Sequence, residues 1–180
     1  MAWTTDDLET GGGILYIQDA TEGEAPSALD WVDCGNCNQF SETPKITNKE
    51  HKSHRSAVAR LDKSISVEFD CEIKFQLDQM NKENLALFFS GVLDGTTIKP
   101  LEAGTLEKSI KWVPHLGNGT ERTHEWLRCQ ISAASGVELV NHGNGETDWA
   151  KMEFTARVLY TETPPAGYGY YGKIYVSPTE

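Results

Sequence analysis

The segment 65–78 alternates between apolar and polar side chains without a break. Its apolar members are Ile65, Val67, Phe69, Cys71, Ile73, Phe75 and Leu77. Successive side chains of a β-strand point to opposite faces of a sheet, so this period of two predicts one long strand with an apolar face buried in a core and a wet polar face. At about 3.3 Å per residue the strand would extend on the order of 45 Å, well past the usual length of five or six residues.

Strand patterns recur along the chain, and one helix is predicted between them. Further strand-like segments are 14–18, 31–40, 109–113, 125–132, 137–140, 149–161 and 173–176. Residues 82–90 predict a short helix, with Asn81 as its N-cap and Gly91 at its end. The fold class we expect is mainly β: two packed antiparallel sheets, sandwich-like or barrel-like, with one short flanking α-helix and a long extended loop.

The chain of 180 residues is long enough for one domain with its own core, and we expect a single domain over residues 1–180. Within it, residues 1–13 predict a polar N-terminal arm, and residues 164–172 predict a loop rich in Tyr and Gly. Residues 44–63 show neither a helix period nor a strand period, so they predict a long loop between strands.

The predicted long loop is basic in an acidic protein. Its net charge is +4, whereas the whole chain carries −11. Two interpretations of this loop remain open. It is a solvated, mobile loop, or it is an arm that docks on acidic positions of a neighbouring molecule through Lys49, Lys52, Arg55 and Arg60.

The net charge of −11 argues against binding to nucleic acid, which depends on clustered Lys and Arg. No apolar run approaches the roughly eighteen residues of a membrane span, and residues 1–13 lack the basic start and apolar middle of a signal peptide. We therefore expect synthesis in the cytoplasm and no membrane partner. The four cysteines are expected to be thiols rather than a disulfide framework.

One candidate metal site combines a CxxC pair with an HxxH pair, namely Cys34, Cys37, His51 and His54. The separation of the pairs is close to that of a zinc finger, although the two residues between the histidines are fewer than the usual three to five. No helix period spans the histidines, and Gly35-Asn36 between the cysteines has the composition of a hairpin turn. We predict no metal and no cofactor, with a zinc protein as an alternative.

Three sequence motifs of catalytic sites, GxSxG, HExxH and the P-loop, do not occur. An acidic row lies on the polar side of the predicted long strand and consists of Glu68, Asp70 and Glu72. Neighbouring carboxylates there would be about 6 to 7 Å apart, which is compatible with glycoside chemistry but is more often found on a solvated surface. A sugar platform would need Trp112, Trp126 and Trp149, whose places in strand patterns favour packing. We expect no enzymatic activity.

The order of these segments resembles the major tail tube protein family of long-tailed, siphovirus-type bacteriophages, which is related in fold to type VI secretion tube proteins. The matching features are a Gly-rich entry to the first strand (GGGILYIQDA), an early tryptophan strand ending in a turn (DWVDCGNCNQFSETPKI), a long polar loop (TNKEHKSHRSAVARLDK), the long alternating strand, and NKENLALFFSG directly after it. They cover residues 11–91, and the later strands agree with the family only in pattern. The cysteines at Cys34 and Cys37 depart from it, since aliphatic or polar residues are expected there.

This resemblance implies a structural virion protein, made in the host cytoplasm, that self-assembles into hexameric rings stacked as the hollow tail tube of the phage. Neighbouring subunits would join their inner sheets into one continuous barrel around a lumen. The partners would be further copies of the chain, the tape-measure protein in the lumen, tail tip and tail terminator proteins, and DNA that passes through without specific binding. Glu68, Asp70 and Glu72 would then face the lumen and repel phosphates.

Two other functions fit parts of the sequence. A β-sandwich module that binds carbohydrate or peptide through exposed Trp and Tyr predicts a soluble monomer whose tryptophan fluorescence responds to ligand. A small zinc-binding protein built on the Cys and His pairs predicts stoichiometric zinc and loss of structure with chelator.

Overall fold

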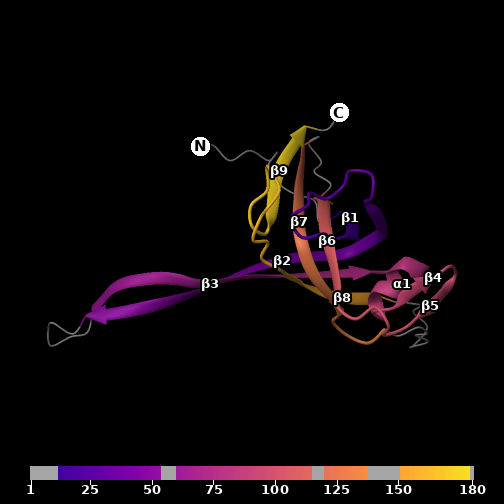
Figure 1. Cartoon of the computed structure of the whole chain (residues 1–180), viewed down its shortest axis with the longest axis horizontal. Helices are drawn as coiled ribbons and strands as arrows, with labels where there is room; N and C mark the ends of the chain where they lie inside the picture. The colour runs from indigo at the N-terminus through magenta and orange to yellow at the C-terminus, as the bar shows by residue number, and fades with distance from the viewer. Residues whose placement is uncertain (1–11, 54–59, 115–119, 138–150, 179–180) are drawn as a thin grey trace.

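The computed structural model describes residues 12–53, 60–114, 120–137 and 151–178 of the chain (Figure 1). Its one described helix is α1 (Lys82–Phe88). Its strands are β1 (Gly13–Asp19), β2 (Val32–Ser53), β3 (Arg60–Leu77), β4 (Val92–Asp94), β5 (Thr97–Lys99), β6 (Leu106–Pro114), β7 (Thr120–Ala133), β8 (Met152–Val158) and β9 (Gly172–Pro178). The predicted mainly-β class with one short helix is therefore confirmed.

Seven strands form one antiparallel sheet in the order β6-β1-β2-β3-β8-β7-β9. Because β6 also pairs with β7, the sheet closes on itself as a barrel, and β9 extends it along β7. The sequence predicted two packed sheets that are sandwich-like or barrel-like. The structure has the barrel-like form, because the two walls that face each other belong to a single closed sheet. Closure satisfies the backbone groups that an open sheet would leave at its edges.

The interior of the barrel is filled by the inward side chains of its strands. Phe75 of β3 stacks on Phe154 of β8 with ring centroids 4.8 Å apart. Residues with no exposed surface come from these two strands and from β1, β6 and β7, and they include Leu15, Leu77, Ile110, Cys129 and Met152. In β8 the buried positions alternate strictly with the less buried ones, as its sequence pattern predicts.

The long strand β3 is only half inside this core. Cys71, Ile73, Phe75 and Leu77 are buried, as predicted, but Ile65, Val67 and Phe69 are about half exposed. The prediction that the whole apolar face is buried is therefore wrong for the first part of the strand. Alternation shows that one face of a strand is apolar, but what covers that face depends on where the neighbouring strands end.

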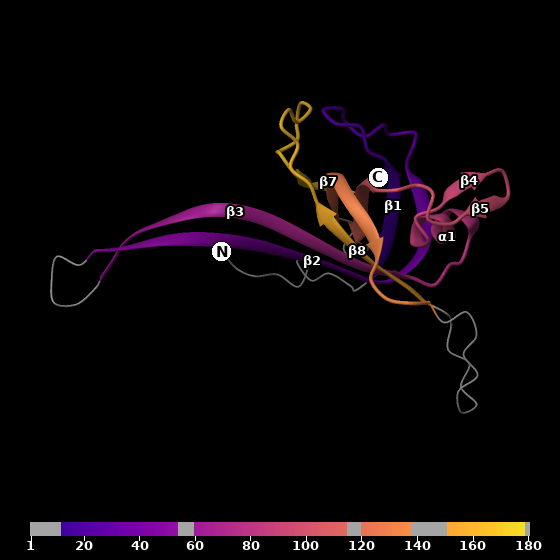
Figure 2. The same ribbon diagram turned by 60° about the horizontal axis from the view of Figure 1, so that its bottom comes forward.

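The first part of β3 pairs with the second part of β2 as a two-stranded ribbon that leaves the barrel on one side (Figures 1 and 2). We call this ribbon the hairpin arm and define it as residues 44–53 and 60–70. The predicted long loop over 44–63 is wrong for every described residue in it, because 44–53 belong to β2 and 60–63 to β3. Both faces of this ribbon are open to solvent, and the sequence of residues 44–53 has no alternation to reveal the strand. Residues 54–59 lie outside the described part.

The helix α1 begins as predicted, with the Asn81 side chain accepting a hydrogen bond of 2.7 Å from the backbone N–H of Asn84. It ends at Phe88, two residues before the predicted end, and Ser90 turns the chain with a positive φ of 46°. The N–H groups of Ser90 and Gly91 bond back to the carbonyls of Leu87 and Ala86, the pattern of a Schellman motif. No helix in the described residues has the length and hydrophobicity needed to cross a membrane.

The remaining strands differ from the sequence predictions in where they begin and end, and one hairpin was not predicted. The hairpin of β4 and β5 follows α1 and has no clear strand pattern, since only Ile98 of its residues is partly buried. Val137, the first residue of one predicted strand, is not in a strand, and residues 138–140 lie outside the described part. Residues 149 and 150 lie outside it as well.

Candidate assembly surface

The hairpin arm presents apolar side chains that nothing in the described chain covers. We call them the apolar stripe: Ile46, Leu61, Ile65, Val67 and Phe69, each between 49% and 57% exposed. Ile46 lies directly opposite Phe69 in the strand register, so these two side chains share one face of the ribbon. The stripe represents a large exposed apolar surface on a ribbon whose other residues are mostly charged or polar.

The backbone edges of the hairpin arm are also without partners among the described strands. On the outer side of β2 the pairing with β1 stops at Asn36, and on the outer side of β3 the pairing with β8 stops at Glu72. An isolated two-stranded ribbon is at best marginally stable in water, and its open edges can pair with another chain. The hairpin arm therefore has the two properties of a surface that is completed by a partner.

The base of the hairpin arm is fixed to the opposite wall of the barrel. Glu42 of β2 accepts hydrogen bonds from Trp126 Nε1 at 2.7 Å and from His124 Nδ1 at 2.8 Å, both on β7. The side chains of Glu42 and His124 are 16% and 19% exposed. These contacts span the sheet between strands that are not neighbours, so they hold the direction in which β2 leaves the barrel.

Two further contacts hold β3 where it enters the barrel. Arg157 of β8 forms a two-point ion pair with Asp70, at 3.3 Å from Nε to Oδ1 and 3.0 Å from Nη2 to Oδ2. The hydroxyl of Tyr171, in the loop before β9, donates to the carbonyl of Phe69 at 3.4 Å. Both strands of the hairpin arm thus have side-chain contacts to the barrel at the base of the arm.

The basic residues predicted to dock on a neighbour lie along this arm. Lys49 and Lys52 are exposed and face Ile65 and Leu61 across the ribbon. Arg60 begins β3, and Arg55 lies outside the described residues. Lys49 and Lys52 are therefore each opposite an apolar side chain of the stripe, an arrangement that the sequence pattern did not indicate.

The three members of the predicted acidic row lie on one face of β3, as the alternation requires. Cationic side chains lie beside two of them. Asp70 pairs with Arg157 and lies opposite Lys45. Glu72 pairs with Lys74 at 2.9 Å. Of the three, only Glu68 lacks an ion pair or side-chain hydrogen bond to a described residue.

The zinc alternative is wrong, because β2 is one continuous strand. Cys37 lies in the barrel and His51 in the hairpin arm, fourteen residues further on, which corresponds to about 46 Å along an extended strand. His51 instead pairs with Asp62 at 2.6 Å, and His54 lies outside the described residues. Burial raises the pKa of the Cys34 thiol to about 12 and that of Cys37 to about 11, which disfavours the thiolate that zinc requires.

The proposed sugar platform is not assembled either. Trp112 is buried and stacks on Phe40 with ring centroids 4.5 Å apart, Trp126 is bound to Glu42, and Trp149 lies outside the described residues. The exposed aromatic pair is Tyr160 and Tyr170, stacked at 5.2 Å. Sequence reasoning missed the contact of Glu42 with His124 and Trp126, because it joins positions too far apart in the chain for any spacing rule.

Comparison with known proteins gives a family but no activity. No curated protein matches the chain. Among solved structures, the cryo-EM structure of the anti-feeding prophage cap (AFP tube terminating cap) is similar, with 12% sequence identity over 99% of this chain and 100% of that chain and a TM-score of 0.42. Values this low carry no argument about function. A family model matches residues 9–110, which include the whole hairpin arm, and the chain belongs to the family described as protein of unknown function UCP028589.

Proposed function

We propose that this chain is a structural subunit that assembles with copies of itself through the hairpin arm. The observation that carries the proposal is the arm itself: a ribbon held at its base by side-chain contacts, with half-exposed apolar side chains and two edges that have no partner among the described strands. Pairing of such edges between copies would satisfy their backbone groups, and contact between the copies would cover the apolar stripe.

The assembly that best uses these features is a tube. If the arms of neighbouring copies lie side by side, their ribbons become one continuous sheet, and a sheet closed around a ring has no edges left. Together with the resemblance of the sequence to major tail tube proteins, this supports stacked, hexameric rings forming a phage tail tube. Tape-measure protein and then DNA would occupy its lumen, and tail tip and tail terminator proteins would bind its ends.

The charges of the segment 44–63 support contact between rings. This segment has a net charge of +4 in a chain of −11, and a positive segment favours an acidic surface on the next copy. We assign Lys49, Lys52, Arg55 and Arg60 to this contact. Since it joins two different surfaces, it propagates into an open stack rather than closing as a dimer.

The acidic row is assigned to the lumen in this proposal. Glu68, Asp70 and Glu72 lie on the face of β3 opposite to Val67 and Phe69. With Asp70 and Glu72 already paired to cations, the face is close to neutral rather than strongly negative. A surface of paired charges has few free cations to bind phosphate, so DNA would pass without adhering.

A second candidate function rests on Tyr160 and Tyr170. An exposed, stacked aromatic pair offers a flat surface for a sugar ring or an aromatic peptide side chain. It predicts a protein that remains monomeric at high concentration and whose fluorescence changes on titration with oligosaccharide.

Negative-stain electron microscopy and sedimentation velocity of the full chain, at low and at moderate salt, test the proposal. Hollow tubes or stacked rings of wild type are expected at high concentration. The variant Val67→Asp/Phe69→Asp should remain monomeric, while the control Glu102→Lys/Glu162→Lys, with changes at exposed positions away from the arm, should assemble. Single rings that never stack would assign an end-capping role instead. A wild type that stays monomeric, and an arm variant that assembles normally, would each contradict self-assembly through the arm.

A further inference from the structure

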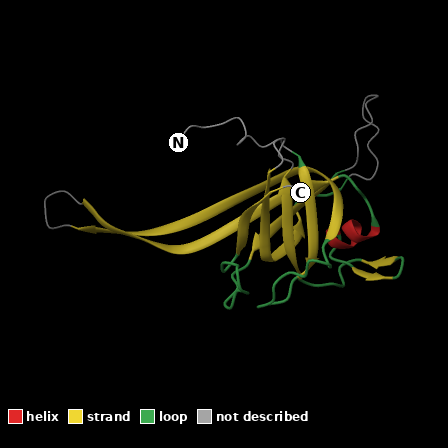
Figure 3. Ribbon diagram, turned by 90° about the horizontal axis from the view of Figure 1, so that it is seen from above, coloured by secondary structure: helices red, strands yellow, loops and turns green. Residues whose placement is uncertain are grey.

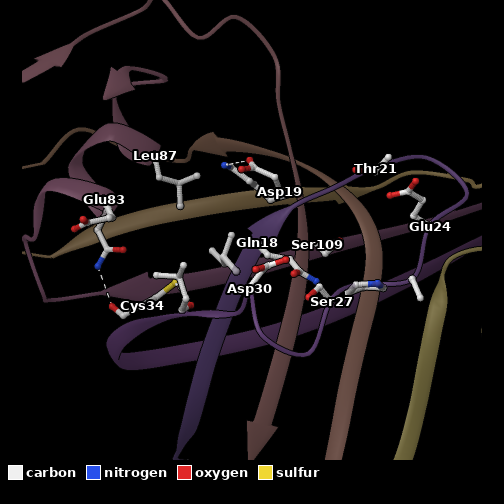
Figure 4. A pocket seen from close by; sticks show the side chains of 16 residues that line it. Gln18, Asp19, Thr21, Glu24, Ser27, Asp30, Cys34, Glu83, Leu87 and Ser109 are labelled. Carbon is white, nitrogen blue, oxygen red and sulfur yellow. Dashed lines mark hydrogen bonds and ion pairs between the residues drawn. The ribbon is translucent and has the colours of Figure 1, made fainter. Parts of the chain in front are cut away.

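The receiving surface for the hairpin arm is the missing part of the assembly proposed above. A cavity of about 430 Å³ lies between β1, the segment 20–31, the start of β2, α1 and β6 (Figure 4). Its wall is partly apolar, with Ile17, Pro26 and Leu87 among the lining residues. It belongs to the body of the protein and shares no residue with the hairpin arm.

A buried amide lies in the wall of this cavity. The side chain of Gln18, on β1, is only 6% exposed, and its Nε2 has no hydrogen-bond partner among the described residues. A buried donor without an acceptor is destabilising, so this position is unfavourable unless something in the cavity accepts the bond. Figure 4 shows Gln18 beside Ser109 and Asp30 in the cavity. The occupant should therefore offer an acceptor, such as a main-chain carbonyl.

The rim of the cavity is acidic. The lining includes four carboxylates, those of Asp19, Glu24, Asp30 and Glu83, against the single ammonium of Lys108. Lys108 is paired with Asp19, and Lys82 lies 3.7 Å from Glu83. Glu24 and Asp30 are exposed, and their side chains make no ion pair or hydrogen bond to any described residue. The occupant should therefore also carry cations, placed to reach Glu24 and Asp30.

The hairpin arm of a second copy has all three properties. Lys49 lies opposite Ile65 and Lys52 opposite Leu61, so each cation is beside an apolar side chain that suits the apolar wall. Near Lys49 and Lys52 the outer edge of β2 has no partner among the described strands, so its main-chain carbonyls can accept from Gln18, and pairing between arms within a ring is left to the residues nearer the barrel. Residues 1–11 of the chain do not suit the rim, because they contain Asp6, Asp7 and Glu9 and no Lys or Arg.

The placement of the two surfaces also fits a repeating contact. The hairpin arm leaves one side of the barrel, while α1, which lines the cavity, lies on the other side (Figures 1 and 3). A copy cannot place its own arm in its own cavity. Contact between the two surfaces is therefore head to tail and leaves a free arm and a free cavity at the ends of every chain of copies.

We propose that this cavity receives the hairpin arm of a neighbouring copy. In this contact Lys49 and Lys52 pair with Glu24 and Asp30, and a main-chain carbonyl of the arm accepts a hydrogen bond from Gln18. The inference rests on the proposed function, since it names the surface that the arm binds during self-assembly.

A charge swap tests the pairing. Glu24→Lys/Asp30→Lys and Lys49→Glu/Lys52→Glu should each raise the protein concentration needed for assembly about tenfold or more, because each places like charges in contact. The variant with all four substitutions should assemble at close to the wild-type concentration, since it restores opposite charges. The control Glu102→Lys/Glu162→Lys makes the same change in net charge as Glu24→Lys/Asp30→Lys at positions that do not line the cavity, and it should assemble like wild type. Circular dichroism of each variant checks that the barrel is folded.

The amide contact needs a separate variant. Gln18→Leu keeps a side chain of similar size but has no donor, so it should raise the assembly concentration several-fold while leaving its dependence on salt unchanged. In contrast, the charge variants should change the dependence on salt. A Gln18→Leu protein that folds and assembles like wild type would overturn the role of the amide.

Zero-length cross-linking of lysines to carboxylates gives a readout that does not depend on substitutions. In a mixture of ¹⁴N- and ¹⁵N-labelled wild-type protein, we expect mixed-label peptides that join Lys49 or Lys52 to Glu24 or Asp30. Assembly with cross-links from these lysines only to other acidic residues overturns this inference and leaves self-assembly intact. A protein that neither assembles nor cross-links between copies overturns both proposals.

Discussion

The indole Nε1 of Trp126 donates a hydrogen bond of 2.7 Å to Glu42 Oε1, and this bond joins the base of the hairpin arm to the far wall of the barrel. The second carboxylate oxygen is bound to His124 on the same strand. Glu42 is opposite Ile73 in the strand register, so it shares the inner face with a fully buried residue. One polar side chain thus connects the core to the surface that we assign to assembly.

Replacing Glu42 should therefore loosen both the barrel and the arm. We expect Glu42→Ala to lower the free energy of unfolding by about 1 to 3 kcal/mol, because it leaves the indole and imidazole donors without an acceptor. Glu42→Gln should have a smaller effect, since its amide oxygen can still accept from Trp126. Chemical denaturation measures the free energy, and a red shift in tryptophan emission reports the changed surroundings of Trp126. Equal stability of Glu42→Ala and wild type would show that the contact contributes nothing.

The strand β3 contains a matched pair of phenylalanines for testing where the core ends. Phe75 is 2% exposed and Phe69 is 54% exposed. Phe75→Ala should lower the free energy of unfolding of the monomer by about 3 to 5 kcal/mol, because it leaves a cavity in the core. Phe69→Ala should change it by less than about 1 kcal/mol. In assembly assays of well-folded protein, Phe69→Ala should have the larger effect and should raise the protein concentration required for assembly. Equal losses of monomer stability would mean that the arm folds back on the barrel in solution.

A buried carboxylate in β7 predicts acid sensitivity. Burial acts to raise the pKa of Glu125, but hydrogen bonds from Tyr168, Tyr175 and Lys173, with the charge of Lys173, outweigh it and hold the pKa below its ordinary value of 4.5. Because the pKa is lower in the folded than in the unfolded state, this carboxylate stabilises the fold above about pH 4.5. That contribution is lost as the pH falls through the folded-state pKa.

Glu125→Gln should accordingly unfold at a lower temperature than wild type at pH 7, and its Tm should fall less steeply between pH 5 and pH 3. The control Glu162→Gln alters an exposed carboxylate and should keep the wild-type slope. Thermal melts followed by circular dichroism at several pH values give both slopes. A wild-type slope in Glu125→Gln would show that other groups cause the acid sensitivity.

The four cysteines should be unreactive thiols in the folded protein. Burial raises the pKa of Cys34 to about 12, that of Cys37 to about 11 and that of Cys71 to about 11, and it raises the pKa of Cys129 as well. At pH 8 a thiol with a pKa near 11 is ionised on the order of one part in a thousand, and the thiolate is the reactive form. A colorimetric thiol reagent should therefore react slowly with native protein and with four thiols after denaturation. Rapid reaction of the native protein would contradict this burial.

Sequence and structure agree on the elements whose pattern depends on local physics. The alternation in β3 and β8 predicted strands, and Asn81 predicted the start of α1, because the pleat of a strand and the free N–H groups of a helix end constrain residues close together in the chain. The resemblance to tail tube proteins was also drawn from the sequence. The sequence did not predict which part of the apolar face of β3 is buried. Ile65 and Ile73 lie in the same alternating pattern and differ only in whether a third strand lies beside them.

Three features depended on tertiary structure alone. Residues 44–53 form a strand because β3 pairs with them, although their own side chains show no period. Glu42 meets His124 and Trp126 because the closed barrel brings β2 opposite β7. Gln18 faces a cavity because the segment 20–31 and α1 pack around β1. The sequence by itself determined where the helix and the strands with an alternating pattern form, whereas closure of the sheet decided which of their side chains are buried, which meet and which remain for a partner.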